Sequence, residues 1–276
     1  MKIVVTGSSG FIGQAVVREL LTRDVDVIGV CRTPVDSDLP LVIIPNYSHT
    51  PVGDVLIHLA EGSNLASIQK KGADYQKQAL NILSGLINKG FSHVIYGSSG
   101  LVYGTKGDYP RSPNESVSPE NIYTQTKLAC EKFILEVKGI SVRMANIYGF
   151  GMASNSVISD ILKQIPGNNP IQVRDNSPVR DFLWIEDAAC GIVEMALSSG
   201  SGIYNLGSGV SVSIGDLLEK ILYLAGQSYR QIQVLQPLKE TSNLTLDISL
   251  TTSTFGWLPK VGLEEGLRCL MNKSYD

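Results

Sequence analysis

The strongest constraint on the fold of this chain is a glycine-rich turn close to its beginning. A short β-branched run, Lys2–Thr6, leads into Gly7-Ser-Ser-Gly10-Phe-Ile-Gly13, and apolar residues at helical spacing follow. Glycines at these positions permit a tight turn, a close approach of the backbone to a phosphate, and close packing of helix on strand. The N-terminus of such a helix offers free N–H groups to a pyrophosphate. The segment therefore predicts a dinucleotide-binding site. The residues that we expect to contact the cofactor here are Gly7, Gly10, Phe11, Ile12 and Gly13.

Strands and helices are predicted to alternate along most of the chain. Short apolar runs that do not alternate in polarity indicate buried strands, whereas longer periodic runs indicate helices. The predicted strands are 2–6, 25–30, 41–44, 54–59, 93–96 and 140–143, and helices are predicted after the glycine turn and at 74–89, 122–137, 185–197 and 214–225. This order predicts an α/β fold of the Rossmann type, with a doubly wound parallel sheet covered by helices on both faces.

The texture of the sequence changes after residue 148. Gly, Asn and Pro become frequent there, as in Pro166-Gly-Asn-Asn-Pro170. We expect a smaller C-terminal substrate-binding lobe in this region. Accordingly, residues 1–148 and about 181–207 are assigned to the dinucleotide-binding domain, and about 149–180 and 208–276 to the lobe.

Composition excludes several classes of function. The chain of 276 residues is 43% hydrophobic and 18% charged, which argues for a packed core and against disorder. Its net charge is −3 with no cluster of lysine and arginine, so we expect no nucleic-acid partner. No run is long enough to span a membrane and no signal peptide is evident, which together with four widely spaced cysteines favours the cytoplasm. The three histidines lie far apart, so no metal site is expected.

The end of the second predicted strand bears on cofactor choice. An Asp or Glu at this place would bind the ribose 2′-hydroxyl of NAD, but this chain has Val30-Cys31-Arg32. A guanidinium can bind a 2′-phosphate, and no carboxylate is there to repel it, so NADP(H) is favoured and NAD(H) is the alternative. Otherwise Arg32 is a surface charge or stacks on adenine.

A tyrosine and a lysine four residues apart indicate acid–base chemistry. Tyr123 and Lys127 share one face of the helix predicted over 122–137. A free phenol has a pKa of about 10, but a neighbouring ammonium stabilises the phenolate, so such a tyrosine can exchange a proton with a substrate hydroxyl. An exposed pair without function is the alternative. Ser99 adds a hydroxyl at the carboxyl end of the strand that begins at His93, where ligands bind in open parallel sheets.

These features form part of a longer set of segments in a fixed order. The set comprises Thr6–Gly13, Asp54-Val-Leu-Ile-His-Leu-Ala60, Ser98-Ser-Gly-Leu-Val-Tyr-Gly104, Tyr123-Thr-Gln-Thr-Lys127, Arg143-Met-Ala-Asn-Ile-Tyr-Gly149, Arg180-Asp-Phe-Leu-Trp-Ile-Glu-Asp187, Tyr204-Asn-Leu-Gly207 and Phe255-Gly-Trp-Leu-Pro259. Together they resemble the extended short-chain dehydrogenases/reductases of the NAD-dependent epimerase/dehydratase family, which act on nucleotide sugars. The resemblance covers nearly the whole chain.

The resemblance implies roles for individual residues. It makes Ser99, Tyr123 and Lys127 the catalytic set, with Lys127 also holding the nicotinamide ribose. The residues that it places on the cofactor include Leu59 and Ala60, and those on the substrate diphosphate are Asn146 and Arg180. An ion pair with Asp181 is the alternative role for Arg180. His58 is interpreted as a packed residue. The helices over 74–89 and 122–137 match those through which relatives dimerise, so a homodimer is expected.

The residues after Ser99 narrow the reaction. Family dehydratases carry acidic residues where this chain has Gly100 and Leu101, and reductases that also epimerise carry a cysteine in place of Leu101. Reduction of a nucleotide-linked 4-keto (deoxy)sugar with NADPH is therefore favoured. A C4 epimerase with retained NAD is the alternative, and a non-catalytic cofactor-sensing protein is a remote one.

The chain also departs from the family pattern, at Glu61 and within residues 236–241. Glu61 follows Ala60 where a second small residue is usual. A second phosphate-binding arginine is not evident within 236–241, where Lys239 would be its substitute.

Overall fold

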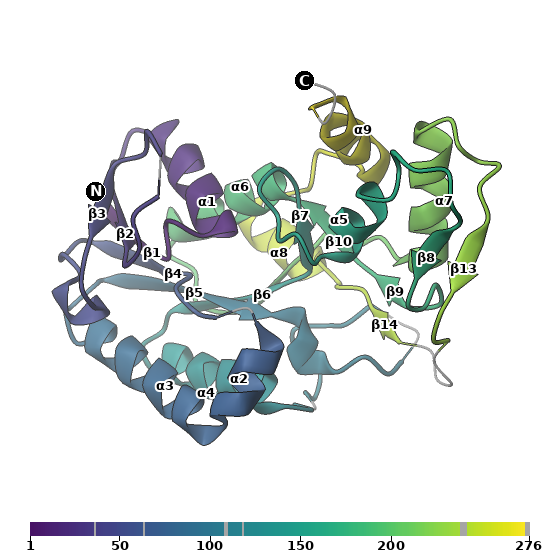
Figure 1. Cartoon of the computed structure of the whole chain (residues 1–276). Helices are drawn as coiled ribbons and strands as arrows, with labels where there is room; N and C mark the ends of the chain where they lie inside the picture. The colour runs from purple at the N-terminus through teal and green to yellow at the C-terminus, as the bar shows by residue number, and fades with distance from the viewer. Residues whose placement is uncertain (36, 63, 108–109, 118, 238–241, 274–276) are drawn as a thin grey trace.

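The computed structural model describes residues 1–35, 37–62, 64–107, 110–117, 119–237 and 242–273. Its centre is a seven-stranded parallel sheet (Figure 1). The strands lie in the order β3 (Leu41–Ile43), β2 (Asp26–Cys31), β1 (Lys2–Thr6), β4 (Val55–His58), β5 (His93–Ser99), β6 (Ile140–Met144) and β11 (Gly202–Leu206). The chain moves outward from β1 to β3 and then returns to the other side of β1, so the strand order reverses between β1 and β4. Ligands bind at such a reversal in doubly wound folds, and the predicted Rossmann-type fold is confirmed.

Helices cover both faces of this sheet. One face carries α1 (Phe11–Leu21) and α6 (Ile185–Ala196), and the other carries α3 (Ala73–Ile87) and α4 (Ile122–Glu136) with α2 (Leu65–Lys71) beside them (Figure 1). A separate cluster of buried hydrophobic side chains fills each side. Every fully buried aliphatic side chain contributes about 1.5–3 kcal/mol to stability. These two clusters therefore hold the helices firmly against the sheet whose edge carries the site.

Local sequence explains where the helix that carries Tyr123 begins. The side chain of Asn121 accepts a hydrogen bond from the N–H of Thr124, and the Thr124 hydroxyl accepts one from the N–H of Asn121. This reciprocal capping satisfies two donors that a helix start leaves unpaired. Tyr123 therefore lies in the first turn of α4, with Lys127 one turn later.

The remaining elements pack beside the carboxyl ends of the central strands. They include β7 (Asn146–Tyr148) paired with β10 (Phe182–Trp184), β8 (Ile171–Val173) paired with β13 (Ile232–Val234), and a sheet of β12 (Val212–Ser213), β9 (Val179–Arg180) and β14 (Asn243–Leu244). The helices of this region are α5 (Val157–Leu162), α7 (Ile214–Leu224), α8 (Ser249–Phe255) and α9 (Leu263–Lys273), and short 3-10 turns span Tyr47–His49 and Gly100–Tyr103. Figure 1 shows α5, α7, β8 and β13 gathered at one end of the molecule, away from β1 to β3.

Three further observations bear on function. All four cysteines carry free thiols, of which those of Cys31 and Cys130 are buried. The described residues contain no group of three or more His, Cys, Asp or Glu side chains arranged to hold a metal ion. No helix within the described ranges has both the length and the apolar character needed to cross a membrane.

Candidate active site

The turn between β1 and α1 has the geometry that a dinucleotide requires. Gly7 has a φ of +76°, and a Cβ atom there would come within 2.7 Å of the Leu59 carbonyl. A Cβ on Gly13 would overlap the backbone of Gly7 and come within 2.8 Å of the Ser8 Cα. Gly10 caps α1 without a side chain, so the N–H groups of the first helical turn face outward unobstructed. These positions fit a bound pyrophosphate, and they explain why only glycine suits Gly7 and Gly13.

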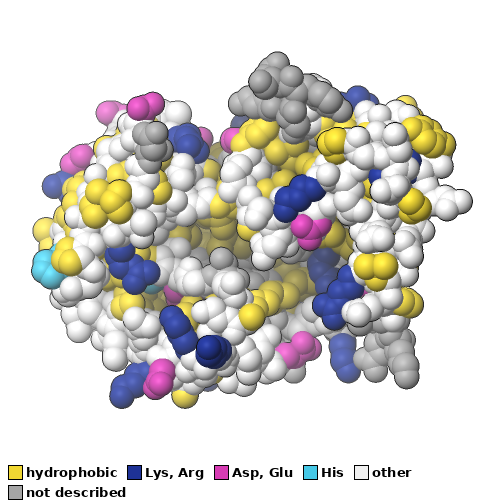
Figure 2. All heavy atoms as spheres, viewed as in Figure 1, with side chains coloured by type: hydrophobic (Ala, Val, Ile, Leu, Met, Phe, Trp, Pro, Cys, Tyr) yellow, Lys and Arg dark blue, Asp and Glu magenta, His cyan; other side chains and the backbone are white. Residues whose placement is uncertain are grey.

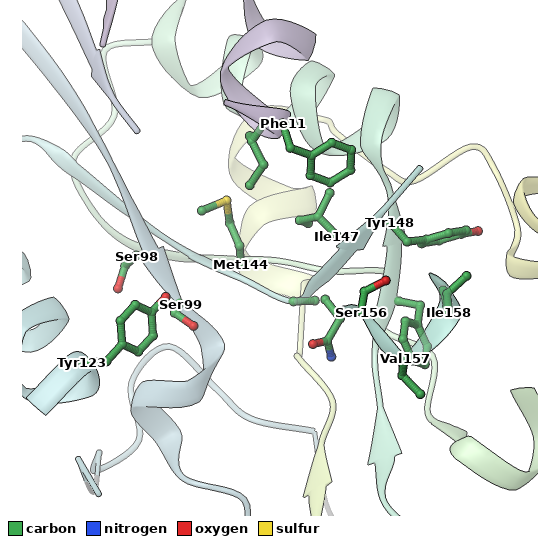
Figure 3. Close-up of a pocket in the computed structure, with 14 residues that line it drawn as sticks. Phe11, Ser98, Ser99, Tyr123, Met144, Ile147, Tyr148, Ser156, Val157 and Ile158 are labelled. Carbon is green, nitrogen blue, oxygen red and sulfur yellow. The ribbon is translucent and has the colours of Figure 1, made fainter. Parts of the chain in front are cut away.

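The main pocket lies next to this turn. It has a volume of about 350 Å³ and is lined by residues from α1, β5, α4, β7 and α5. Figure 2 shows the hollow between the two upper parts of the molecule, and Figure 3 shows the side chains around it. Five predicted site residues meet in its wall: Phe11, Ile12, Ser99, Tyr123 and Asn146.

The serine and the tyrosine approach the pocket from different elements. Ser99 ends β5, and its Oγ accepts a hydrogen bond from the N–H of Leu101 at 3.2 Å, which starts the Gly100–Tyr103 turn. Figure 3 shows the ring of Tyr123 directed toward Ser99. The pair can therefore act on one substrate oxygen, with the serine hydroxyl as a hydrogen-bond partner and the phenol as the proton donor or acceptor.

Lys127 is buried behind Tyr123, where it contacts a carboxylate. Its Nζ lies 2.9 Å from Glu61 Oε2 and donates to the carbonyl oxygen of Gly97 at 2.6 Å. The same Nζ is 5.7 Å from the centroid of the Tyr123 ring. Burial acts to lower the pKa of Lys127, but Glu61 and other neighbouring groups together outweigh it, so the pKa is raised above its ordinary value. The sequence marked Glu61 as unusual without indicating that it pairs with Lys127.

A second buried ion pair supports the strand that carries Ser99. The guanidinium of Arg143 binds Glu131 twice, through Nη2 to Oε2 at 2.7 Å and through Nε to Oε1 at 3.0 Å. Both side chains are 3% exposed. The hydroxyl of Ser98 donates to Glu131 Oε1, so the residue before Ser99 is attached to α4. Sequence analysis did not identify this network.

The other side of the glycine turn offers space for the adenosine half of a cofactor. The Cζ of Arg32 lies 5.1 Å from the centroid of the Tyr47 ring, a distance typical of a cation–π contact. Arg32 lines two adjoining pockets, one with Asn46 and Tyr47 and one with Ala60 and Glu61. The guanidinium thus borders both of these pockets.

His58 is packed within the sheet. Its Nδ1 lies 2.6 Å from the hydroxyl of Thr6, and burial lowers the pKa of the ring to about 4. The imidazole is therefore neutral at neutral pH.

The two residues assigned to the substrate diphosphate differ in their surroundings. Asn146 lines the main pocket, and its Nδ2 donates to the carbonyl oxygen of Asp181 at 3.3 Å. Arg180 donates to the carbonyl oxygens of Val179 and Ser242 at 2.8 Å, and to the Ser242 hydroxyl at 2.9 Å. It is not among the described residues that line the main pocket. Lys239 lies outside the described residues.

Sequence comparison agrees with this geometry. The sequence model described as the NAD dependent epimerase/dehydratase family matches residues 3–207, from the first strand to the end of β11. The chain belongs to the NAD-dependent epimerase/dehydratase family. It is therefore an enzyme of the extended short-chain dehydrogenase/reductase type, in a family of nucleotide-sugar epimerases, dehydratases and reductases.

Individual relatives match this family member over nearly its whole length. It is 24% identical to dTDP-4-dehydro-6-deoxyglucose reductase of Escherichia coli, over 96% of this chain and 95% of that one. It is 27% identical to a putative UDP-glucose 4-epimerase of Methanocaldococcus jannaschii, over 98% and 97% of the two chains.

Among solved structures, MoeE5 in complex with UDP-glucose and NAD superposes with a TM-score of 0.86 at 22% identity, over 100% of both chains. The UDP-glucose 4-epimerase of Thermotoga maritima with UDP-glucose gives a TM-score of 0.86, again at 22% identity over 100% of both chains. At this level of identity the two structures confirm the fold.

Proposed function

We propose that this enzyme reduces the 4-keto group of a nucleotide-linked (deoxy)sugar with NADPH. The observation that carries the proposal is the main pocket, in which Phe11 and Ile12 of the dinucleotide turn share a wall with Ser99 and Tyr123. NADPH, when bound, supplies a hydride. Ser99 donates a hydrogen bond to the keto oxygen, and Tyr123 gives its phenolic proton to that oxygen as C4 becomes a carbinol. The products are the 4-hydroxy sugar and NADP⁺.

The residue after Ser99 supports a single proton transfer. Gly100 is buried, and a Cβ atom at this position would lie 3.2 Å from the Leu246 side chain and 3.2 Å from the Met144 carbonyl oxygen. Any side chain at this position would be crowded, and glycine supplies neither the acid nor the base that elimination of water would require. Similarity to a reductase of Escherichia coli along nearly the whole chain adds to this argument.

Mass spectrometry of the nucleotide that copurifies with the protein, followed by a panel of keto nucleotide sugars, tests the proposal. We expect little retained NAD and turnover that depends on added NADPH. Binding of NADPH without oxidation by any member of the panel would favour a cofactor-sensing role instead.

A second candidate is a C4 epimerase that retains NAD. It is favoured by similarity to proteins named UDP-glucose 4-epimerase, which covers nearly the full length of both chains. An epimerase must return the hydride to the opposite face of a transient ketone, so it does not release its cofactor between steps. Purified enzyme that interconverts C4 epimers without added nucleotide would establish this candidate.

The preference for NADPH rests on Arg32. Its guanidinium borders both pockets on the adenosine side, and a charged hydrogen bond to a phosphate contributes about 1.5–3 kcal/mol. We expect Arg32→Ala to raise the KM for NADPH by about tenfold to a hundredfold and to change the KM for NADH much less. Steady-state kinetics with both nucleotides measure the effect. Lys132→Ala, on the exposed side of α4, serves as the control, and equal changes for both nucleotides would contradict the assignment.

We further propose the partners and placement of the enzyme. The diphosphate of the substrate would contact Asn146, at the end of the dinucleotide-binding domain of residues 1–148 and about 181–207, and Arg180 in the lobe of about 149–180 and 208–276. For Arg180 this requires release of its bonds to Ser242. A homodimer through α3 and α4 would bury the partly exposed Leu80 and Phe133, and sedimentation of the purified protein measures its mass. The four free thiols support a reducing compartment such as the cytoplasm.

A further inference from the structure

Glu61 occupies a special place beside the catalytic lysine. It directly follows Leu59 and Ala60 after β4, and its side chain is 9% exposed. One carboxylate oxygen, Oε2, forms the ion pair with Lys127. The other, Oε1, accepts a hydrogen bond from the Tyr96 hydroxyl at an O–O distance of 2.6 Å. Burial acts to raise the pKa of Glu61, but the Lys127 ammonium, the hydrogen bond from Tyr96 and other neighbouring groups together hold the pKa below its usual value. The carboxylate is therefore ionised at neutral pH.

Other titratable groups face the same ammonium, from each element packed around it. They are Tyr123 and Cys130 of α4, Tyr96 of β5, His58 of β4 and Tyr75 of α3. Burial lowers the pKa of His58 to about 4, raises the pKa of Cys130 and of Tyr75 to about 12, and raises the pKa of Tyr96 well above its ordinary value. These four groups are therefore neutral at neutral pH.

The remaining charged groups of this region either lie in the neighbouring pocket or are paired with another residue. Lys71 of α2 and Arg32 line the neighbouring pocket with Glu61, whereas Arg143 of β6 is paired with Glu131. Among the described residues, Glu61 is thus the carboxylate within ion-pair distance of Lys127.

The position of this charge bears directly on the phenol. An ammonium close to a tyrosine favours loss of the phenolic proton. A carboxylate 2.9 Å from the same nitrogen opposes that field, because its negative charge disfavours a phenolate nearby. Lysine has three N–H donors, of which one is given to the Gly97 carbonyl, so Lys127 keeps donor capacity for a bound ribose beside its ion pair with Glu61.

We propose that Glu61 is a positioning residue that holds Lys127 in place and offsets its charge, so that Tyr123 keeps its proton to a higher pH than the lysine alone would allow. The proposal rests on the proposed function, in which a protonated phenol must be present before the hydride is transferred. It also explains why a carboxylate is useful here, where relatives have a small residue.

The titration of Tyr123 tests the proposal without substrate. Phenolate absorbance is recorded against pH for each protein and for its Tyr123→Phe counterpart, and the difference isolates Tyr123. We expect Glu61→Gln to lower the midpoint by about one pH unit, since it removes a negative charge that disfavours the phenolate and leaves the Lys127 ammonium unopposed. Glu61→Asp retains the charge and should titrate near the wild-type pH. Glu264→Gln removes a carboxylate from a surface ion pair and should change nothing.

A midpoint unchanged by Glu61→Gln overturns the proposal. If that variant does not fold, Glu61→Ala restores a small residue and is expected to show the same downward shift, and its absence has the same meaning. In turnover assays, the alkaline limit of NADPH-dependent activity should fall with the midpoint. A wild-type enzyme that reduces no keto sugar, together with a shifted midpoint, overturns the proposed function and leaves the charge effect of Glu61 supported.

Discussion

Replacing Tyr123 with phenylalanine is expected to lower kcat by about 100- to 10,000-fold and to leave NADPH binding nearly unchanged. A positioned acid or base contributes a factor of this size, and phenylalanine retains the ring that lines the pocket but carries no proton to transfer. NADPH oxidation in the presence of a keto nucleotide sugar measures kcat, and fluorescence titration with NADPH measures the Kd. The change removes no contact of Lys127 with Glu61 or Gly97.

Tyr223→Phe provides the matched control for this experiment. Tyr223 lies on α7 and is 67% exposed, so loss of its hydroxyl should leave both kcat and Kd at wild-type values. Turnover by Tyr123→Phe within tenfold of the wild type would remove the phenol from the mechanism. Turnover that falls as expected would also eliminate the non-catalytic alternative.

The largest loss of stability is expected from Glu131→Gln. This change leaves the guanidinium of Arg143 buried without its counter-charge, and removing one partner of a buried ion pair costs about 3–5 kcal/mol of the free energy of unfolding. Ser98 also loses a charged acceptor, which loosens the end of β5 at Ser99. Urea unfolding followed by circular dichroism measures the loss.

A surface pair gives the comparison for this prediction. Glu19 of α1 pairs with Arg23, just beyond the end of that helix, and their side chains are 25% and 33% exposed. Arg23 also pairs with Glu194, so Glu19→Gln should cost only about 0–1 kcal/mol. Similar losses for Glu19→Gln and Glu131→Gln would mean that the Arg143 network contributes no more than an exposed ion pair.

Sequence patterns predicted six of the seven strands of the central sheet and missed β11. The strands expected at 25–30 and 93–96 are found at Asp26–Cys31 and His93–Ser99, and the helix expected at 122–137 is found at Ile122–Glu136. These elements are buried on one or both sides, so their apolar spacing carries the signal. The placement of Tyr123 and Lys127 on one face of α4 could be predicted for a related reason, because residues four apart in a helix share a face.

The features of the site that could not be predicted from the sequence depend on contacts between distant segments. Glu61 follows β4 and Lys127 lies on α4, and the two residues meet only when α4 packs against the assembled sheet. The bonds of Arg180 to Ser242 depend on the pairing of β9 with β14, which are strands of two residues each. Strands this short carry no periodic pattern, so their partners could not be predicted.

The most direct measurement is the stoichiometry of NADPH oxidation with a 4-keto nucleotide sugar, with the product identified by mass spectrometry and NMR. We expect one NADPH to be oxidised for each 4-hydroxy sugar formed, and no interconversion of C4 epimers in the absence of added nucleotide. Epimerisation by an enzyme that retains its own NAD and consumes no NADPH would contradict this expectation.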